Sequence, residues 1–522
     1  MQPGDHADSD PERIALVVVG QGGGRSYRQL EDRSRRAAQL LARAGLRAGQ
    51  VVALLMGNEA ELLEICWGAR RSGLYYCAIG THLRPQEVAY VLSDCGAQAL
   101  FASASVGGLA AQASYLAAQA GDGTRDLLRV ACGGGIAGFE SYEELLEGVP
   151  PLRLAGETEG TDLLYSSGTT GRPKGVRHEL SGAPYGTPDG LCVIAAGLYG
   201  MDATSVYLSP APLYHAAPLR FCMAAQRLGA TVAVMERFDP EGFLAAVGRW
   251  RVTHAQLVPT MMVRLSKLPP AVWDRHDLSS LRCLVHASAP CPVPLKHEMI
   301  RRFGPILHEY YAGTEANGFV AIDTPTWLEH PGSVGRPVIG VVHVLDEDGA
   351  ELAAGQRGVV YFEGGPSFAY HNDAAKTSAS HDRRGWSTLG DVGHLDGDGF
   401  LFLTDRLAFT IVSGGVNVYP REAEDVLVTH PAVADAAVFG IPDEDLGEQV
   451  KAVVEPLEWP PGAAGASELE EALISWCRSR LAAYKCPRSI DLVRALPRLP
   501  TGKLAKRALQ DPYWPRRDRR VN

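Results

Sequence analysis

A dozen residues, YSSGTTGRPKGV (Tyr165–Val176), combine the chemical groups that bind a polyphosphate. Glycines let a backbone turn tightly and expose its N–H groups, hydroxyl side chains add hydrogen-bond donors, and a lysine adds positive charge. A Walker-type P-loop is excluded, because Lys174 follows a proline and precedes a glycine. The segment therefore predicts a polyphosphate-binding loop rather than a merely polar surface loop. The predicted ligands are Ser166, Ser167, Gly168, Thr169, Thr170, Gly171 and Lys174.

Alternating helix and strand patterns surround this loop. Residues 26–45 begin with a capping box, carry apolar residues at helical spacing and end in glycine, which predicts a helix. Residues 51–56 (VVALLM) are typical of a buried strand, and residues 59–71 of the next helix. The same alternation returns between residues 204 and 315, where strand-like segments end in small or polar residues. In an open α/β sheet, ligands are held at such strand ends.

The pattern changes twice in the second half of the chain. From about residue 335, shorter segments such as RGVVYFEGG and GFLFLTDR predict a β-rich subdomain. Beyond it we expect a hinge at 405–408 and a separate small domain over 409–522. That domain is expected to hold a helix over 421–429, two strands, a loop over 459–466 and then an amphipathic helix. Residues 1–404 form the expected N-terminal domain.

Length, charge and cysteine usage limit the function classes. The 522 residues exceed one ordinary core, so at least two folding units are expected. A formal charge of −10 argues against a broad nucleic-acid or anionic-membrane surface. The first residues lack the cationic start and apolar run of a signal peptide, and no stretch reaches the length of a membrane span, so we expect a cytoplasmic protein. Ten cysteines without metal-like spacing predict buried free thiols.

Five motifs, in one order over nearly the whole chain, resemble those of the adenylate-forming (AMP-binding) superfamily, which includes acyl-CoA synthetases, firefly luciferase and the adenylation domains of peptide synthetases. The polyphosphate loop resembles the signature loop of the family. YYAGTE (310–315), the segment 386–406 that contains LGD and ends in TDR, SGGVNVYPREAE (413–424) and LPRLPTGKLAKRAL (496–509) follow in the order of the family. The chain is most like an acyl-CoA synthetase, a fatty-acid or aromatic-acid CoA ligase. The resemblance implies an α/β fold, with a large N-terminal domain of parallel-rich α/β subdomains plus a β-rich subdomain and a small mobile α+β C-terminal domain.

The resemblance also implies a role for each motif. Glu315 and Thr170 would hold Mg²⁺, and a carboxylate suits a hard cation that bridges phosphate oxygens. Asp391 would accept hydrogen bonds from both ribose hydroxyls, and Arg406 would contact the ribose or a phosphate. Lys503 would bridge the substrate carboxylate and the α-phosphate in the transition state. The predicted catalytic residues are Lys503, Glu315 and Thr170, and the predicted adenine and ribose positions are Ser288, Ala289, Pro290, Tyr310, Tyr311, Ala312, Gly313, Thr314, Asp391 and Arg406.

The remaining implied positions concern the acyl group, CoA and the domain pivot. Ala408 occupies the pivot, where relatives usually carry a charge. Lys506, in contrast with Lys503, is expected to be a solvated surface lysine. Small residues around the acyl site indicate a mostly apolar cavity for a medium-chain, cyclic or aromatic acid. The predicted acyl-site residues are His215, His286, Ala312 and Gly313, with Ala216, Ala217 and Ala287 nearby, and the predicted CoA-binding residues are Ser413, Gly414 and Gly415.

The implied reaction is ATP-dependent activation of a carboxylic acid to an acyl-adenylate, with release of pyrophosphate, followed by transfer to CoA. Transfer to an amine is the main alternative, because the uncharged pivot departs from the family pattern, and acylation of a carrier protein is another. A degenerate nucleotide-binding protein is disfavoured, because Lys503, Glu315 and Asp391 are all present. The expected cofactors and partners are ATP, Mg²⁺, CoA and a small carboxylic acid, without nucleic acid; a homodimer and a lysine acyltransferase acting on Lys503 are also considered.

Overall fold

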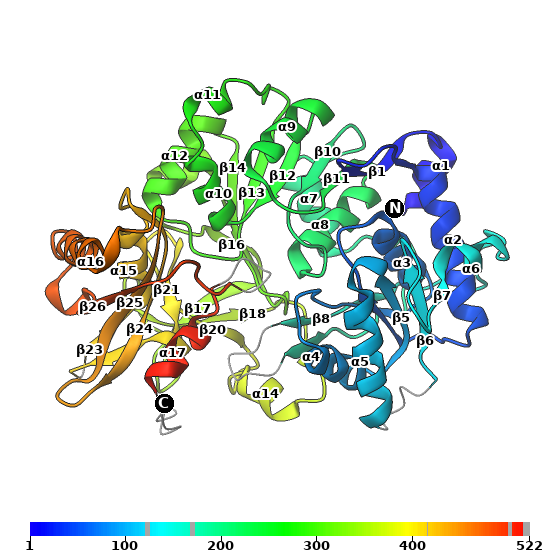
Figure 1. Ribbon diagram of the computed structural model, residues 1–522. Coiled ribbons are helices and arrows are strands. Elements are labelled where there is room, and N and C mark those ends of the chain that lie inside the picture. The colour runs from blue at the N-terminus through cyan, green and yellow to red at the C-terminus, as the bar shows by residue number, and fades with distance from the viewer. Residues whose placement is uncertain (121–125, 167–172, 415, 499–503, 515–522) are drawn as a thin grey trace.

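The computed structural model describes residues 1–120, 126–166, 173–414, 416–498 and 504–514. Figure 1 shows a large N-terminal domain on the right and a smaller C-terminal domain, coloured orange to red, on the left. The large domain is of mixed α/β type, which confirms the predicted fold class. The limits proposed for the domains and for the hinge stay predictions.

An eight-stranded sheet forms the first part of the large domain. In sheet order its strands are β19 (Ala369–Tyr370), β9 (Lys174–Arg177), β8 (Thr161–Ser166), β4 (Tyr75–Ala78), β3 (Val51–Leu55), β5 (Ala97–Ser103), β6 (Leu128–Cys132) and β7 (Glu140–Ser141). Strands β8 to β7 run parallel, and β9 turns back antiparallel along β8. All five residues of β3 are buried, as expected of a parallel strand covered on both faces.

The helices of this part are α2 (Tyr27–Arg43), α3 (Ala60–Arg71), α4 (Pro85–Asp94), α5 (Gly107–Ala120) and α6 (Tyr142–Glu147). The predicted capping box at the start of α2 is confirmed. The backbone N–H of Gln29 donates to Oγ of Ser26 at 3.3 Å, and the backbone N–H of Ser26 donates to Oε1 of Gln29 at 2.9 Å. The structure therefore begins this helix where the sequence pattern predicts.

A nine-stranded sheet forms the middle of the large domain. In sheet order its strands are β16 (Arg336–Ile339), β15 (Phe319–Asp323), β14 (Leu307–Tyr311), β13 (Cys283–His286), β12 (His254–Leu257), β10 (Val206–Ser209), β11 (Thr231–Met235), β1 (Ile14–Val19) and β2 (Arg25–Ser26). Its helices are α7 (Gly190–Gly197), α8 (Ala216–Arg227), α9 (Pro240–Trp250), α10 (Pro259–Ser266), α11 (Pro270–Trp273), α12 (Val293–Phe303) and α13 (Thr324–Glu329), and α1 (Pro3–Ser9) precedes β1. Strands β1 and β10 to β14 are parallel.

A four-stranded antiparallel sheet is the predicted β-rich subdomain. Its strands are β17 (Val341–Leu345), β18 (Gly358–Glu363), β20 (Ser387–Leu395) and β21 (Leu401–Arg406), and α14 (Ala374–Ala379) precedes β20. The tight turn predicted at Asp396 and Asp398 joins β20 to β21, where Oδ1 of Asp396 accepts from the backbone N–H of Asp398 at 3.0 Å. Strand β21 ends at Arg406, within the predicted hinge, and a short 3₁₀ turn follows it (Leu407–Phe409).

The C-terminal domain is built around its own five-stranded sheet. The strands are β22 (Ile411–Ser413), β23 (Val416–Val418), β24 (Val433–Asp443), β25 (Gly447–Pro456) and β26 (Ser489–Leu492), and the helices are α15 (Pro420–Leu427), α16 (Gly462–Arg478) and α17 (Lys506–Gln510). Helix α16 begins within the loop predicted over 459–466, so that prediction is wrong at its end. Three alanines follow Gly462 within five residues, and alanine has the highest helix propensity.

Helix α15 of the small domain forms hydrogen bonds with β21, the last strand of the large domain. The backbone N–H of Arg421 donates to Oδ2 of Asp405 at 3.0 Å, and Nη1 of Arg421 donates to the carbonyl oxygen of Leu403 at 2.9 Å. On another edge, Nζ of Lys267 donates to the carbonyl oxygen of Val433 at 3.4 Å. The two domains are therefore joined by polar contacts at two places besides the connecting segment.

All ten cysteines are free and buried, which confirms that prediction. Among the helices of the described residues, none is long and apolar enough to cross a membrane.

Candidate active site

The predicted polyphosphate loop lies between two neighbouring strands of the eight-stranded sheet. Ser166 ends β8 and Lys174 begins β9, so the strands bring the two ends of the loop together. Five of the predicted ligands lie outside the described residues, namely Ser167, Gly168, Thr169, Thr170 and Gly171. The predicted magnesium ligand Thr170 is among them.

Two lysines lie near one tyrosine ring at the end of this loop. Nζ of Lys174 is 5.6 Å from the centroid of the Tyr370 ring, and Nζ of Lys376 is 5.4 Å from it. Burial, and then the Lys376 ammonium, lower the pKa of Lys174 to about 8, although the Glu315 carboxylate acts in the opposite direction. Two positive charges held together in this way favour an anion, because a bound anion relieves their mutual repulsion. Sequence reasoning identified Lys174 but missed Lys376.

Tyr370 also orients the predicted magnesium ligand. Its hydroxyl donates to Oε1 of Glu315 at 2.9 Å. Gly313 makes room for this carboxylate, since a Cβ at that position would come within 2.7 Å of Oε2 of Glu315 and 2.8 Å of Leu389. Ala316, directly after Glu315, has a φ of 50°, a region that non-glycine residues rarely adopt. Gly313 therefore packs closely against these two side chains, and Tyr370 is a site residue that no local motif reveals.

Tyr311, Asp391 and Arg406 meet at the edge of the four-stranded sheet. The hydroxyl of Tyr311 donates to Oδ2 of Asp391 at 2.6 Å, and Nε of Arg406 donates to Oδ1 at 3.1 Å. Asp391 and Arg406 are direct partners across β20 and β21, so the sheet register itself creates the pair. Burial, and then the Asp391 carboxylate, raise the pKa of Tyr311, so its hydroxyl stays a donor. The structure brings these three predicted residues together.

The neighbouring tyrosine lies in the core instead. Tyr310 stacks on Phe319 with ring centroids 4.8 Å apart, and its hydroxyl accepts from Nε2 of Gln256 at 2.7 Å. Successive side chains of a strand point to opposite faces, so Tyr310 and Tyr311 on β14 have opposite environments. With an exposure of 7%, Tyr310 supports the nine-stranded sheet, and the adenine contact predicted for it is not supported by its position.

The segment predicted beside adenine follows β13. Ser288 has a φ of 75°, so this non-glycine residue holds a left-handed conformation. Ser288 and Pro290 are exposed and Ala289 is half-buried, whereas Ala287 is buried. Strained backbone of this kind is found mostly at functional sites. Ser288 and Ala316 are thus two strained positions that directly follow predicted binding residues of neighbouring strand ends.

The two predicted acyl-site histidines have different surroundings. His286 is 1% exposed, and its Nε2 lies 3.7 Å from Oε2 of Glu309, which forms a buried ion pair with Lys296 at 2.6 Å. Burial, and then Lys296, lower the pKa of His286 well below its usual value, so the ring is neutral at pH 7. His286 therefore lies beside this ion pair, and its predicted place in the acyl site stays a prediction. His215 is half-buried just before α8, with its ring 4.4 Å from that of Tyr214.

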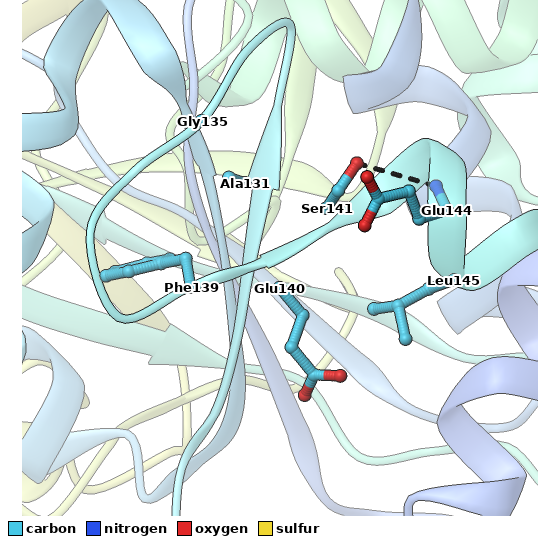
Figure 2. Close-up of a pocket in the computed structure, with 7 residues that line it drawn as sticks. All are labelled: Ala131, Gly135, Phe139, Glu140, Ser141, Glu144 and Leu145. Carbon is cyan, nitrogen blue, oxygen red and sulfur yellow. Dashed lines mark hydrogen bonds between the residues drawn. The ribbon is translucent and has the colours of Figure 1, made fainter.

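A hollow in the large domain lies away from these residues. It has a volume of about 330 Å³ and lies beside β6, β7 and α6 (Figure 2). Ser141 within it is the N-cap of α6, with its Oγ accepting from the backbone N–H of Glu144 at 3.4 Å. A second hollow of about 430 Å³ lies around Tyr75, Arg177 and Phe368. Neither is lined by a residue predicted for the nucleotide, the acid or CoA.

The C-terminal residues of the prediction are only partly described. Lys503 and Gly415 lie outside the described residues, and Ala408 lies in the 3₁₀ turn after β21. Ser413 and Gly414 end β22 and enter the turn to β23, which lies toward the outer left of Figure 1. The CoA-binding role of this turn stays a prediction.

Lys506 is buried, so the prediction of a solvated surface lysine is wrong. Its exposure is 8%, and its Nζ lies 2.8 Å from Oε1 of Glu424. Burial opposes its charge, but the carboxylates of Glu424 and Asp405 outweigh burial and raise the pKa of Lys506. The correction follows from tertiary contacts, because both carboxylates come from segments far from Lys506 in the sequence.

Comparisons with known proteins agree with this geometry. A model of the AMP-binding enzyme family matches residues 4–369, and a model of the AMP-binding enzyme C-terminal domain matches residues 422–503. The chain is 33% identical over 494 residues to a feruloyl-CoA synthase from Amycolatopsis sp, with 94% of each protein covered.

Two solved structures are similar over nearly their whole length. One is the o-succinylbenzoate CoA synthetase from Bacillus subtilis in complex with its acyl-adenylate intermediate, with 28% identity, a TM-score of 0.79, and 98% of this chain and 97% of that chain covered. The other is an amide bond synthetase from Marinactinospora thermotolerans, with 28% identity, a TM-score of 0.79, and 95% and 96% covered. Because the family models match both domains and the curated relative exceeds 30% identity over most of its length, the chain belongs to the AMP-binding enzyme family.

Proposed function

We propose that the protein is an AMP-forming acid:CoA ligase. It activates a carboxylic acid with ATP, releases pyrophosphate and transfers the acyl group from the adenylate to the thiol of CoA. The observation that carries the proposal is the cluster of Tyr311, Asp391 and Arg406, within electrostatic reach of Glu315. The names of the feruloyl-CoA synthase and the o-succinylbenzoate CoA synthetase support CoA as the acceptor.

The residues of the chain bind and orient the reactants. Asp391 already accepts one hydrogen bond on each oxygen, and a carboxylate has about four acceptor sites, so it retains capacity for both ribose hydroxyls. Lys174 and Lys376 supply positive charge for the leaving pyrophosphate. Lys503 supplies the charge that bridges the acid and the α-phosphate. This work is positioning and electrostatic stabilisation, and it needs no covalent intermediate with the enzyme.

Magnesium fits the donor set at Glu315. A carboxylate is the hard oxygen ligand that Mg²⁺ prefers, and Tyr370 fixes one of its oxygens through the hydrogen bond of 2.9 Å. Glu315, with Thr170, would hold the ion, which neutralises charge on the phosphate oxygens when bound.

The proposed acid is aromatic, cyclic or of medium chain length. The proposal is supported by small side chains at the start of α8 and at the ends of β13 and β14, which suit an apolar group; these residues are Ala216, Ala217, Ala287, Ala312 and Gly313. The feruloyl-CoA synthase and the o-succinylbenzoate CoA synthetase are named for aromatic acids, so an aromatic acid is the preferred proposal of the three.

A panel of carboxylic acids tests the proposal. The purified protein is given MgATP and one acid at a time, with CoA, with an amine, or with neither, and pyrophosphate release and product mass are measured. We expect at least one aromatic acid to release pyrophosphate and CoA to yield its thioester. Release of pyrophosphate with no thioester under any condition would contradict CoA as the acceptor, and no release with any acid would contradict acid activation.

An amide-forming ligase is the second candidate. It is favoured by the likeness to the amide bond synthetase and by the uncharged residue at the predicted pivot, Ala408. The same panel separates the two, since amide in the presence of an amine and no thioester in the presence of CoA would support this candidate.

A further inference from the structure

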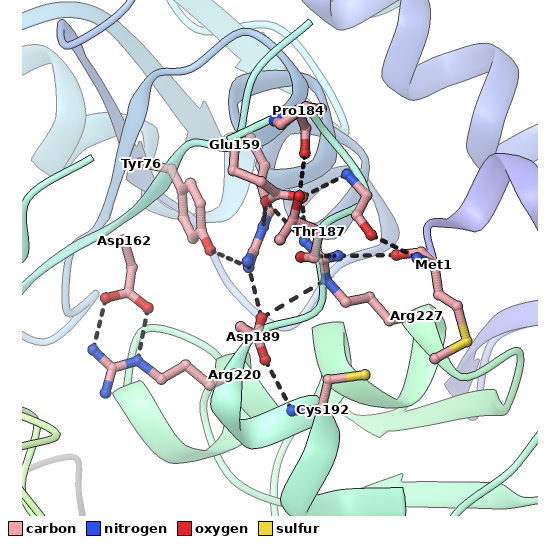
Figure 3. Close-up of polar contacts among 12 residues, drawn as sticks. Met1, Tyr76, Glu159, Asp162, Pro184, Thr187, Asp189, Cys192, Arg220 and Arg227 are labelled. Atoms are coloured by element: carbon pink, nitrogen blue, oxygen red, sulfur yellow. Dashed lines mark hydrogen bonds and ion pairs between the residues drawn. The ribbon is translucent and has the colours of Figure 1, made fainter. Parts of the chain in front are cut away.

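The guanidinium group of Arg220 contacts both the strand that leads into the polyphosphate loop and the segment that contains Glu315. Arg220, on α8, donates from Nε and Nη2 to the two oxygens of Asp162, both at 2.7 Å. Its Nη1 donates to the carbonyl oxygen of Thr314 at 3.1 Å. Figure 3 shows the two-point contact with Asp162 at its lower left.

The two partners of Arg220 lie in or beside the two segments proposed to bind the phosphates and Mg²⁺, namely the polyphosphate loop and the segment that contains Glu315. Asp162 is in β8, whose last residue, Ser166, belongs to the predicted polyphosphate loop. Thr314 directly precedes Glu315 and follows β14. Strands β8 and β14 belong to different sheets, so Arg220 connects the eight-stranded sheet to the nine-stranded one.

The contact is suited to fixing a distance. Arginine presents its donors in a planar, rigid fork, which constrains both partners more tightly than a lysine does. Asp162 is 3% exposed, and burial alone would raise its pKa, but the Arg220 guanidinium outweighs burial and holds that pKa below its usual value. The carboxylate of Asp162 therefore stays ionised. Arg220 uses its donors for this carboxylate rather than for a substrate anion.

We propose that Arg220 is a positioning residue for the adenylation reaction. It holds β8 and the Glu315 loop at a fixed separation, so that the polyphosphate loop and Glu315 act on the same MgATP. It acts through Asp162 and Thr314 and touches no reactant. This inference rests on the proposed function, and it assigns a role to a residue that lies outside the five motifs of the sequence.

The same helix offers a matched control. Arg227 is also buried and paired, with Nη2 donating to both oxygens of Glu159 at 2.7 and 2.8 Å (Figure 3). It also contacts the carbonyl oxygens of Met1 and Thr187 and, with Nε at 3.7 Å, the Oδ2 of Asp189, and all of these partners lie outside the polyphosphate loop and the segment around Glu315. Loss of Arg227 should therefore lower the stability of the fold without changing the binding of Mg²⁺ or ATP.

The experiment compares Arg220→Gln, Arg220→Lys and Arg227→Gln in the full chain. Adenylation is followed by acid-dependent exchange of pyrophosphate into ATP, with KM for MgATP, KM for the acid and the dependence on free Mg²⁺ measured separately. For Arg220→Gln we expect KM for MgATP to rise about tenfold or more and the Mg²⁺ requirement to increase, with KM for the acid unchanged. Arg220→Lys should recover part of the loss, and Arg227→Gln should change only the unfolding midpoint.

A second variant covers the case in which Arg220→Gln does not fold. The pair Asp162→Asn with Arg220→Gln removes both buried charges, so it should fold, yet it should keep the defect in MgATP because the contact with Thr314 is altered. The proposal is overturned if the Arg220 variants lower the unfolding midpoint while KM for MgATP and the Mg²⁺ dependence match the wild type. It is also overturned if only KM for the acid rises.

Failure of the proposed function has a different signature. If the wild type exchanges no pyrophosphate with any acid, the ligase proposal fails, and binding of MgATP measured by calorimetry still tests Arg220. Weaker MgATP binding in Arg220→Gln than in Arg227→Gln would then support the positioning role, and equal binding would overturn it.

Discussion

Nζ of Lys506 lies 2.8 Å from Oε1 of Glu424, and this ion pair fixes the start of α17 to helix α15. Both side chains of the pair are largely buried, with exposures of 10% for Lys506 and 17% for Glu424. Nζ of Lys506 also lies 5.4 Å from the centroid of the Phe409 ring, directly after the predicted pivot. The segment that follows Lys503 is therefore tied both to the core of the small domain and to its connection with the large one.

Lys506→Met should destabilise the C-terminal domain strongly. The substitution leaves Glu424 buried without its cation, a change that costs about 3–5 kcal/mol for a buried pair. Urea unfolding of the full chain measures the loss. Lys485→Met is the matched control, because Lys485 pairs with Glu422 in the same domain but is more exposed, and it should lose about 1 kcal/mol or less. Equal losses in the two variants would contradict a special role for the Lys506 pair.

The pH dependence of ATP use should follow Lys174. Its pKa in the free protein is lowered to about 8 by burial and Lys376, with Glu315 opposing and Arg406 adding to the shift. Below pH 8 the ammonium is intact, and above it the site loses a cation for the phosphates. We therefore expect kcat/KM for ATP, which reports the free enzyme, to fall as the pH rises through 8.

Lys376→Met tests the cause of that pH dependence. Removing the second ammonium should raise the pKa of Lys174, so the fall in kcat/KM should move to higher pH even though the value at pH 7 is reduced. Lys485→Met, which changes a lysine of the other domain, should leave the profile unchanged. A profile of Lys376→Met that falls at the same pH as the wild type would show that another group titrates.

Much of the fold was readable from the sequence, because local signals and tertiary structure agree there. The capping box of α2 and the continuous apolar run of β3 predict their elements correctly. The prediction of a loop over 459–466 is wrong from Gly462 onward, where α16 begins. The prolines and glycines of this stretch favoured a loop in the prediction, whereas its alanines form the first turn of the helix.

The site was predictable only where its residues form contiguous motifs. Asp391 and Arg406 lie in one hairpin of strands, so one stretch of sequence contains both. Tyr370, Lys376 and Arg220 were missed, since each acts on a residue that folding brings from a distant segment, namely Glu315, Lys174 and Asp162 in that order. The same reason explains why Lys506 was taken for a surface residue.

Asp391→Asn should weaken recognition of the ribose hydroxyls. In the wild type, Tyr311 and Arg406 each occupy one acceptor site of the Asp391 carboxylate and leave others for the nucleotide. We expect the wild type to prefer ATP over 2′- or 3′-deoxyATP by about tenfold, the size of one hydrogen bond to a charged group. The amide that replaces the carboxylate in this variant has one acceptor oxygen, so the preference should shrink and KM for ATP should rise.

Tyr311→Phe is the control for this change. It removes one donor to Asp391 but keeps the ring and the carboxylate, so the preference for the ribose hydroxyls should persist. Equal use of ATP and both deoxy nucleotides by the wild type would contradict the role of Asp391.

Lys503→Ala should separate the two half-reactions. The lysine supplies a compact positive charge only while negative charge redistributes between the acid and the α-phosphate, so its loss should reduce adenylation by about 10²–10³-fold, as for other groups that stabilise a transition-state charge. Thioester formation from a supplied acyl-adenylate involves attack on the acyl carbon and not on the α-phosphate, so it should proceed at close to the wild-type rate. Pyrophosphate exchange measures the first step and thioester mass the second, with Lys485→Met as the control for removal of a C-terminal lysine. Equal loss of both steps would show instead that Lys503 maintains the arrangement of the domains, because a defect in domain placement affects both reactions alike.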